Sequence, residues 1–309
     1  MYQKPCVLTT QFQFSEFFDL DKAYSEAEEF AKSHYENFPV ISLFISKSLR
    51  KHIAVIYQFA RQADDIVDEG IANTTRLTHS DSECELRMQN LELYYQQLTD
   101  SLNEKFASPF WAALYNTIKQ FNLTTKNFHD LLDAFRQDIV KNCYETFEEL
   151  LHYCERSANP VGRIVLELHN IRDQESIDYS DAICTALQLT NFYQDVSLDY
   201  PNKNRIYIPA TEIRNFSVTE NIFQLKENSI NFQQLLKYQV ERTKQLFING
   251  RRLLPRLPYR LRFQIRITIL GGEEILKKIS YINYNVLSIR PTLTRIDILK
   301  LFFKALLNL

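Results

Sequence analysis

Glycine is scarce in this chain, with 5 glycines among 309 residues. An average protein contains about 7% glycine, several times the fraction found here. Glycine serves tight turns and phosphate-wrapping loops, because it adopts backbone conformations that other residues avoid. The scarcity therefore disfavours a many-stranded sandwich, a Rossmann fold and a P-loop enzyme, and the sequence contains no Gly-rich nucleotide motif.

Helical periodicity dominates the chain instead. We expect helices at residues 21–33, 49–69, 83–102, 109–120, 125–142, 146–157, 161–169, 177–198, 231–253, 259–282 and 296–307, and a loop at 199–209. No linker rich in Pro, Gly or Ser divides the chain, and no helical repeat is present. We therefore expect a single all-α domain spanning residues 1–309, with its helices surrounding a central hydrophobic cavity.

Bulk charge and cysteine usage exclude several classes of partner. The formal net charge is −2, which gives no general reason to expect nucleic-acid binding. The scattered cysteines indicate reduced thiols in an intracellular protein; they are Cys6, Cys84, Cys143, Cys154 and Cys184. The N-terminal residues do not resemble a signal peptide, and no uncharged apolar stretch of about 18 residues predicts a transmembrane helix.

Two rows of acidic and amide side chains carry the functional prediction. In "YQFARQADDIVDEG", helical spacing aligns Arg61, Asp64 and Asp68 on one face and turns Asp65 partly aside. We call Asp64 and Asp68 the first acidic row. In "LTNFYQDVSLDY", the second acidic row consists of Asn191, Asp195 and Asp199, again at intervals of one helical turn.

Oxygen ligands at this spacing suit a hard cation. Mg²⁺ takes one or two carboxylates, keeps several waters and completes its shell with substrate phosphate oxygens. Two facing rows could therefore hold Mg²⁺ ions against a diphosphate. The alternative is a pair of solvated helix faces, which a single DxxxD motif would favour but two such rows among apolar residues do not.

Both motifs closely resemble the two aspartate motifs of the squalene/phytoene synthase family. Further segments are similar to other parts of that family, namely "FPVISLFISKSLRKHIAVIY", "AFRQDI", "YCERSANPVGRIVLEL" and "ILKKISYINYNVLSIRPTLTRIDILKLFFKAL". The resemblance covers nearly the whole chain and implies a single-domain isoprenoid-synthase helical bundle. "RSANPVG" and "NFYQD" are most similar to the bacterial hydroxysqualene synthase branch.

The resemblance also implies residue roles. Asp64 and Asp68 would bind Mg²⁺ on one wall of the cavity, and Asn191, Asp195 and Asp199 would bind it on the opposite wall. Substrate diphosphate would be contacted by Ser42, Arg61, Asn191, Arg205 and Tyr207. Tyr153 would line the site near the reacting carbons and act in catalysis together with Asp64, Asp68, Asp195 and Asp199.

The implied activity is Mg²⁺-dependent conversion of presqualene diphosphate to hydroxysqualene and diphosphate, with Mn²⁺ as an alternative ion and no nicotinamide cofactor. One alternative is a squalene, dehydrosqualene or phytoene synthase that condenses two farnesyl or geranylgeranyl diphosphates. Another is a non-catalytic relative that serves in assembly. Product chain length and oligomeric state stay open. We expect a cytoplasmic protein. The basic, apolar stretch at 251–266 is either a solvated helix face or a surface for peripheral contact with an anionic membrane.

Several other positions complete the expectations. Most squalene and phytoene synthases have Val-Ala-Gly where this chain has "SANP", and Arg where it has Gln194, which removes a positive charge beside Asp195. Arg136 and Asp138 could both face the cavity. Ser157 and Asn159 could position a water, or the "NPVG" segment could instead shape a helix kink at Pro160. His52 is interpreted as a surface or capping residue.

Overall fold

The computed structural model describes residues 19–34, 46–68, 81–219 and 221–307. Within these ranges the chain is helical and forms no β-strand, which confirms the all-α class. The helices are α1 (Leu20–Ser33), α2 (Lys47–Asp68), α3 (Asp81–Leu102), α4 (Pro109–Phe121), α5 (Thr125–Val140), α6 (Phe147–Ser157), α7 (Asn159–Leu168), α8 (Gln174–Gln194), α9 (Val196–Lys203), α10 (Ala210–Asn215), α11 (Ile222–Leu225), α12 (Ile230–Gly250), the 3₁₀ helix η2 (Arg251–Arg256), α13 (Tyr259–Tyr281) and α14 (Arg295–Leu307).

Several helices begin at residues whose side chains satisfy the first free amides. Asp19, Thr146, Asp173 and Ser229 each accept a hydrogen bond from the backbone N–H three residues later. Such capping replaces a bond that the first turn cannot make within the helix. These caps set where α1, α6, α8 and α12 start.

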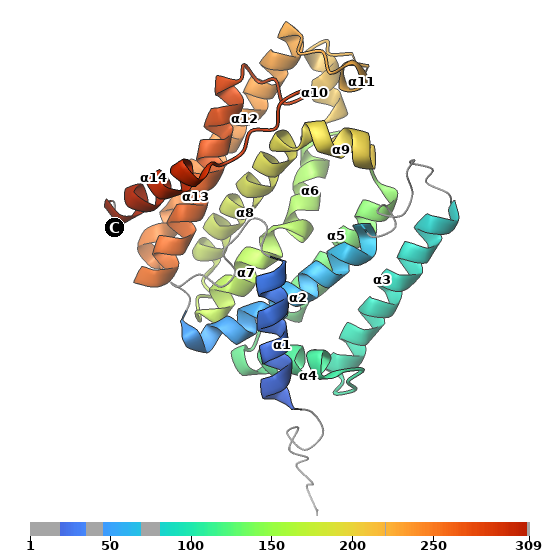
Figure 1. Cartoon of the computed structure of the whole chain (residues 1–309), viewed down its shortest axis with the longest axis vertical. Coiled ribbons are helices and arrows are strands. Elements are labelled where there is room, and N and C mark those ends of the chain that lie inside the picture. Colours follow the sequence, from blue (N-terminus) through green and yellow to red (C-terminus); the bar gives the residue numbers. More distant parts are fainter. Residues whose placement is uncertain (1–18, 35–45, 69–80, 220, 308–309) are drawn as a thin grey trace, which may run out of the picture.

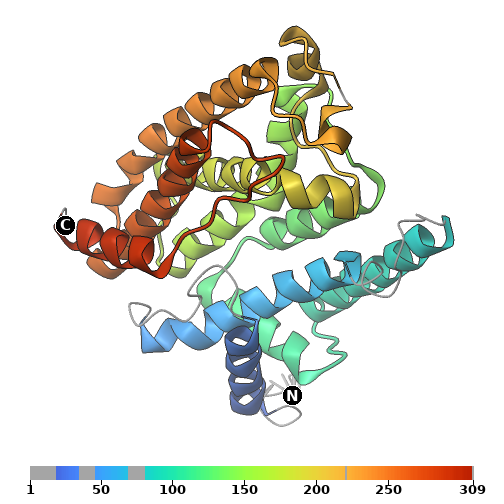
Figure 2. The same ribbon diagram turned by 45° about the horizontal axis from the view of Figure 1, so that its top comes forward.

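The helices assemble around two main cores. Figure 2 shows α1, α2 and α3, in blue to teal, lying beneath the bundle built from the later helices. The first core gathers side chains of α1 to α5, with Phe59 completely buried among aromatic neighbours. The second core is built on α8, which packs against α12, α7 and α13 (Figure 1). The predicted single domain is not tested by this arrangement and stays a prediction.

Two glycines allow helices of the second core to approach closely. A Cβ atom at Gly250 would collide with the Ile183 side chain and lie 3.1 Å from the Tyr179 carbonyl oxygen, both on α8. A Cβ atom at Gly272 would lie 2.5 Å from the Phe247 ring. The few glycines of this chain thus include two that are required where helices pass one another.

Most predicted helices are confirmed within a few residues at their ends, but the region after residue 194 differs. The single helix predicted at 177–198 is divided at Asp195 into α8 and α9. The loop predicted at 199–209 is helical up to Lys203, because α9 accommodates Pro201. The short helices α10 and α11 were not predicted, since they are too short to show a periodic pattern, and the helix predicted at 231–253 ran into the first residues of η2.

Among the described helices, none combines the length and the apolar character needed to cross a bilayer. The four described cysteines, Cys84, Cys143, Cys154 and Cys184, form no disulfide.

Candidate active site

The first acidic row lies on the last two turns of α2, and both of its carboxylates are half-buried. The Arg61 guanidinium approaches Asp65 at 2.9 Å and Asp64 at 3.5 Å. Asp65, expected to turn partly aside, is therefore the closer partner of Arg61. Asp64 lies farther from the Arg61 guanidinium and is bound more weakly by it.

The second acidic row crosses the break between α8 and α9. The Asp195 N–H donates to the Asn191 carbonyl at 2.9 Å, and the Asp199 N–H donates to the Asp195 carbonyl at 2.8 Å. These bonds keep the helical spacing of the row although the backbone of Asp195 itself departs from the helix. The Asn191 side chain is exposed.

Arg290 and Pro291, between α13 and α14, contact this second row. Arg290 donates to both carboxylate oxygens of Asp195, at 2.5 and 3.2 Å. The neighbouring Gln194 amide donates to the Pro291 carbonyl at 2.7 Å. Arg290 therefore supplies beside Asp195 the positive charge that Gln194 lacks.

Lys203 joins the two acidic rows. Its ammonium group, on α9, lies 2.9 Å from the Asp68 carboxylate on α2. The rows belong to helices far apart in the sequence, yet Asp68 is close enough to raise the pKa of Asp199. The fold thus brings together the two acidic rows predicted from the sequence.

Arg205 and Tyr207 follow α9 in a segment fixed to the end of α5. The Ile206 N–H donates to the Asn142 carbonyl at 2.8 Å, forming an isolated bridge. Arg205 donates to the backbone carbonyl of Asp138 at 2.6 Å. Both predicted residues are therefore held beside the acidic rows.

Tyr153 is buried, and its hydroxyl donates to Asp138 at 2.7 Å. Among the described residues, the other Asp138 oxygen, Oδ1, has no hydrogen-bond partner. Arg136 instead pairs with Glu92 at 2.7 Å and lies over the Tyr95 ring. Of the two candidates in "AFRQDI", only Asp138 therefore contacts the predicted site residues.

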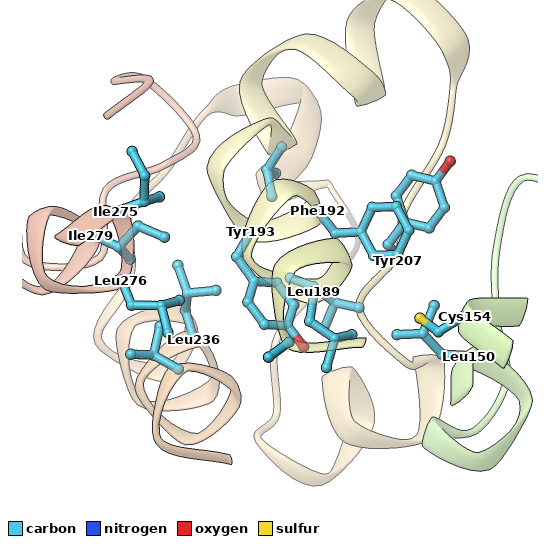
Figure 3. Close-up of a cluster of buried hydrophobic side chains, with 14 of the residues drawn as sticks. Leu150, Cys154, Leu189, Phe192, Tyr193, Tyr207, Leu236, Ile275, Leu276 and Ile279 are labelled. Carbon is cyan, nitrogen blue, oxygen red and sulfur yellow. The ribbon is translucent and has the colours of Figure 1, made fainter. Parts of the chain in front are cut away.

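Four rings, which we call the aromatic wall, lie beneath these charges: Tyr144, Tyr153, Phe192 and Tyr207. Phe192 and Tyr207 stack almost parallel, with centroids 3.6 Å apart, as Figure 3 shows. The Tyr153 centroid is 6.1 Å from each of them, and that of Tyr144 is 5.5 Å from that of Tyr153. A narrow cleft at this place is lined by Phe192, Val196, Asp199, Arg205, Ile206, Tyr207, Ile208 and Phe223.

Three carboxylates of the site resist ionisation. Burial raises the pKa of Asp64 to about 6, assisted by the nearby Asp68 and opposed by Arg61 and Lys203. Burial, with Asp195 beside it, raises the pKa of Asp199 to about 6. Burial also raises the pKa of Asp138 to about 6, although Arg205 and the Tyr153 hydroxyl oppose the shift. Bound cations would relieve this crowding of negative charge.

The donor set fits divalent ions that are shared with a phosphate ligand. In the described part of the chain, no three His, Cys, Asp or Glu side chains converge on a point where they could hold one metal ion. Mg²⁺ needs only one or two carboxylates when phosphate oxygens and waters complete its shell. The oxygen-only rows and their raised pKa values match that kind of site, with Asp64, Asp68, Asn191, Asp195 and Asp199 as its expected ligands.

Three further predictions concerned Ser42, Asn159 and a helix kink at Pro160. Ser42 lies outside the described residues. Asn159 is buried, and its side-chain oxygen accepts a hydrogen bond from Thr185 at 3.0 Å, so it ties α7 to α8. The kink expected near Pro160 is confirmed, since α6 ends at Ser157 and α7 begins at Asn159.

His52 is not a surface or capping residue. Its side chain is 1% exposed and pairs with the Thr117 hydroxyl at 2.9 Å. Burial lowers the pKa of His52 to about 4, so the ring is neutral near pH 7.

Metal affinity should fall with acidity. Carboxylates bind a metal ion in the deprotonated form, and Asp64 and Asp199 take up protons as the pH falls through about 6. We expect Mn²⁺ to bind about tenfold more weakly for each pH unit below that point for each carboxylate that must lose a proton. Electron paramagnetic resonance titration with Mn²⁺ alone, between about pH 5 and about pH 7.5, measures this dependence. An affinity that does not change across this range would contradict it.

Comparison with known proteins relates this chain to a family of enzymes. Residues 31–297 match the family model for squalene/phytoene synthase. The hydroxysqualene synthase of Zymomonas mobilis is 37% identical over 213 residues, which cover 68% of this chain and 67% of that protein. The crystal structure of squalene synthase HpnC from Alicyclobacillus acidocaldarius superposes with a TM-score of 0.77 at 34% identity, covering 86% of this chain and 96% of that one. A ligand-bound dehydrosqualene synthase gives a TM-score of 0.81 at 21% identity, covering 96% and 99%.

Proposed function

The chain belongs to the squalene/phytoene synthase family, and from this premise we propose that it converts presqualene diphosphate to hydroxysqualene with release of diphosphate, in a Mg²⁺-dependent reaction. It is an enzyme of the prenyl diphosphate synthase type. The narrower assignment is supported by the Zymomonas mobilis relative, a hydroxysqualene synthase. It draws further support from the likeness to HpnC at 34% identity.

One observation carries the proposal. Lys203 of α9 reaches Asp68 of α2 at 2.9 Å, and this contact supports an arrangement in which both acidic rows face one ligand. Arg61, Lys203, Arg205 and Arg290 add four cationic groups around them. A diphosphate with bound divalent ions is the ligand whose charges match such a mixture.

The charged residues would bind and orient the diphosphate. Bound Mg²⁺ would make it a better leaving group by offsetting the negative charge that develops on its oxygens. The guanidinium groups of Arg61 and Arg205 offer planar forks that suit phosphate oxygens. The carboxylate rows would keep the cations and the diphosphate beside Asp199, so that the hydrocarbon would extend on the side of the aromatic wall.

Departure of diphosphate leaves a carbocation, and the aromatic wall suits it. Ring faces attract cations, and a buried apolar surface excludes bulk water. Opening of the cyclopropane ring and addition of one water then give the alcohol, with a proton lost to solvent. No hydride is transferred, so the proposed reaction requires no nicotinamide cofactor.

Two other functions remain to be distinguished. The family name covers synthases that condense two prenyl diphosphates, and such an activity would use the same acidic rows. A non-catalytic role in assembly would not require both rows, yet Asp64, Asp68, Asn191, Asp195 and Asp199 are all retained.

Product analysis tests the proposal. Purified protein is incubated with Mg²⁺ and, separately, with presqualene, farnesyl or geranylgeranyl diphosphate, and lipids are identified by mass spectrometry while released diphosphate is measured. We expect hydroxysqualene from presqualene diphosphate. Squalene, dehydrosqualene or phytoene from the other substrates, without hydroxysqualene, would replace this proposal with the condensing activity, and no diphosphate release from any of them would favour the non-catalytic role.

A further inference from the structure

The outer side of α14 presents a row of large apolar side chains. Ile296, Leu299, Phe303 and Leu307 follow one another at intervals of three or four residues and therefore share one face of the helix. Each is between 54% and 86% exposed. We call these four residues the α14 outer face.

The opposite side of α14 is already used in packing. Leu301 and Ala305 are buried against Phe263 and Leu270 of α13. Figures 1 and 2 show α14, in dark red, lying on the outside of the bundle against α13. The α14 outer face is thus not part of the core, although apolar side chains of this size are normally buried.

Positively charged side chains flank the α14 outer face. Arg295, Lys300 and Lys304 are exposed on α14, while its one acidic residue, Asp297, is bound by Lys278 at 2.6 Å and by Thr294. The nearby start of α13 adds the exposed Arg260. An apolar helix face flanked by lysine and arginine complements a membrane surface with anionic headgroups.

In the basic stretch at 251–266, Arg251, Arg256 and Arg262 are engaged within the protein itself. Arg251 pairs with Glu273, and Arg256 pairs with Asp173 and Glu175. Arg262 donates to a backbone carbonyl at the end of η2. These three arginines are therefore poorer candidates for lipid headgroups than the exposed Arg260 of the same stretch and the exposed Arg295 and Lys300 of α14.

We propose that the α14 outer face binds the surface of an anionic lipid bilayer, with the helix lying in the plane of the headgroups. A second copy of the chain is a poorer occupant, because a symmetric contact through this face would bring the same lysines and arginines against each other. The inference goes beyond the proposed function and does not depend on it.

α14 follows closely after a chain segment that contacts the candidate active site. The chain between α13 and α14 carries Arg290, which holds Asp195, and Pro291, which accepts from Gln194. The membrane-binding helix thus begins immediately after the segment that contacts the second acidic row.

Vesicle flotation of the full chain tests the inference. We expect the protein to float with vesicles of phosphatidylglycerol and phosphatidylcholine, and recovery to fall about tenfold with phosphatidylcholine alone or in high salt. The double variant Leu299→Glu with Phe303→Glu should reduce recovery with anionic vesicles by about tenfold or more. The matched control, Ile230→Glu with Ile248→Glu, changes two similarly exposed apolar residues of α12 and should float like the wild type.

The outcomes separate this inference from the proposed function. Both double variants should retain the wild-type melting temperature and the diphosphate release from detergent-dispersed substrate, because the altered side chains face solvent. If the wild type fails to float with anionic vesicles, or the α14 variant floats as well as the wild type, the inference is wrong. A wild-type dimer that the α14 substitutions convert to a monomer, without vesicle binding, would instead identify an interface between copies and also overturn it.

Discussion

Replacing Asp64 by Asn is expected to lower the turnover of presqualene diphosphate about a thousandfold. The substitution keeps the shape of the side chain and removes the negative charge that a divalent ion requires. Metal ions contribute several kcal/mol to the stabilisation of a developing anion, and about 4 kcal/mol corresponds to this loss of rate. Steady-state measurement of diphosphate release at saturating Mg²⁺ gives the result.

The same variant should fold at least as stably as the wild type. Burial and the neighbouring Asp68 disfavour the ionised form of Asp64, as its raised pKa shows, so a neutral amide removes an unfavourable charge. Urea unfolding above about pH 7 measures this. Asp178→Asn, an exposed position on α8, is the matched control and should change neither property. If Asp64→Asn retained more than about a tenth of wild-type turnover, Asp64 would not be a metal ligand.

Tyr153→Phe is expected to reduce turnover about a hundredfold, in the range typical of a side chain that positions or moves a proton. Phenylalanine preserves the ring and its place in the aromatic wall. It removes the hydroxyl that donates to Asp138 at 2.7 Å. Since the second Asp138 oxygen has no partner in the described chain, the carboxyl group would then lose a hydrogen bond in a buried place, which costs about 1–3 kcal/mol of stability.

The Asp138→Asn variant distinguishes the role of the Tyr153 hydroxyl from that of the Asp138 charge. An asparagine still offers an oxygen to the Tyr153 hydroxyl but carries no charge. We expect a smaller loss of about tenfold, with the hydroxyl kept in place. Single-turnover rates and denaturant unfolding of both variants provide the comparison. Turnover of Tyr153→Phe within about twofold of the wild type would show that the hydroxyl is dispensable.

The helices and the acidic rows could be predicted because both depend on local spacing. Apolar residues repeated at helical intervals located most helices, and the same spacing aligned Asp64 with Asp68. The buried position of His52 could also be predicted from local spacing. His52 lies in register with Val55, Phe59 and Ala63 along the buried side of α2, so its position already indicated the core.

The cations that hold the site could not be found in this way. Lys203 and Arg290 reach carboxylates that are distant in the sequence, and no local pattern connects such partners. The division of α8 from α9 escaped prediction for a related reason, since the hydrogen bonds on either side of Asp195 continue the helical spacing through the break. Arg136 and Asp138 were likewise ambiguous, because helix periodicity does not tell which neighbour each side of α5 meets.

The glycines at the helix crossings limit how this protein could be engineered for heat resistance. Exchanging a helical glycine for alanine commonly raises stability by about 0.4–1 kcal/mol, because it restricts the unfolded chain. Here Gly250 and Gly272 are closed to that strategy, since the added methyl group would strike α8 or the Phe247 ring. Gly271 is open to it, because a methyl group there would meet the Leu293 side chain at an ordinary 3.7 Å. Substitution of alanine for glycine would therefore stabilise the protein at Gly271 and destabilise it at the adjacent Gly272.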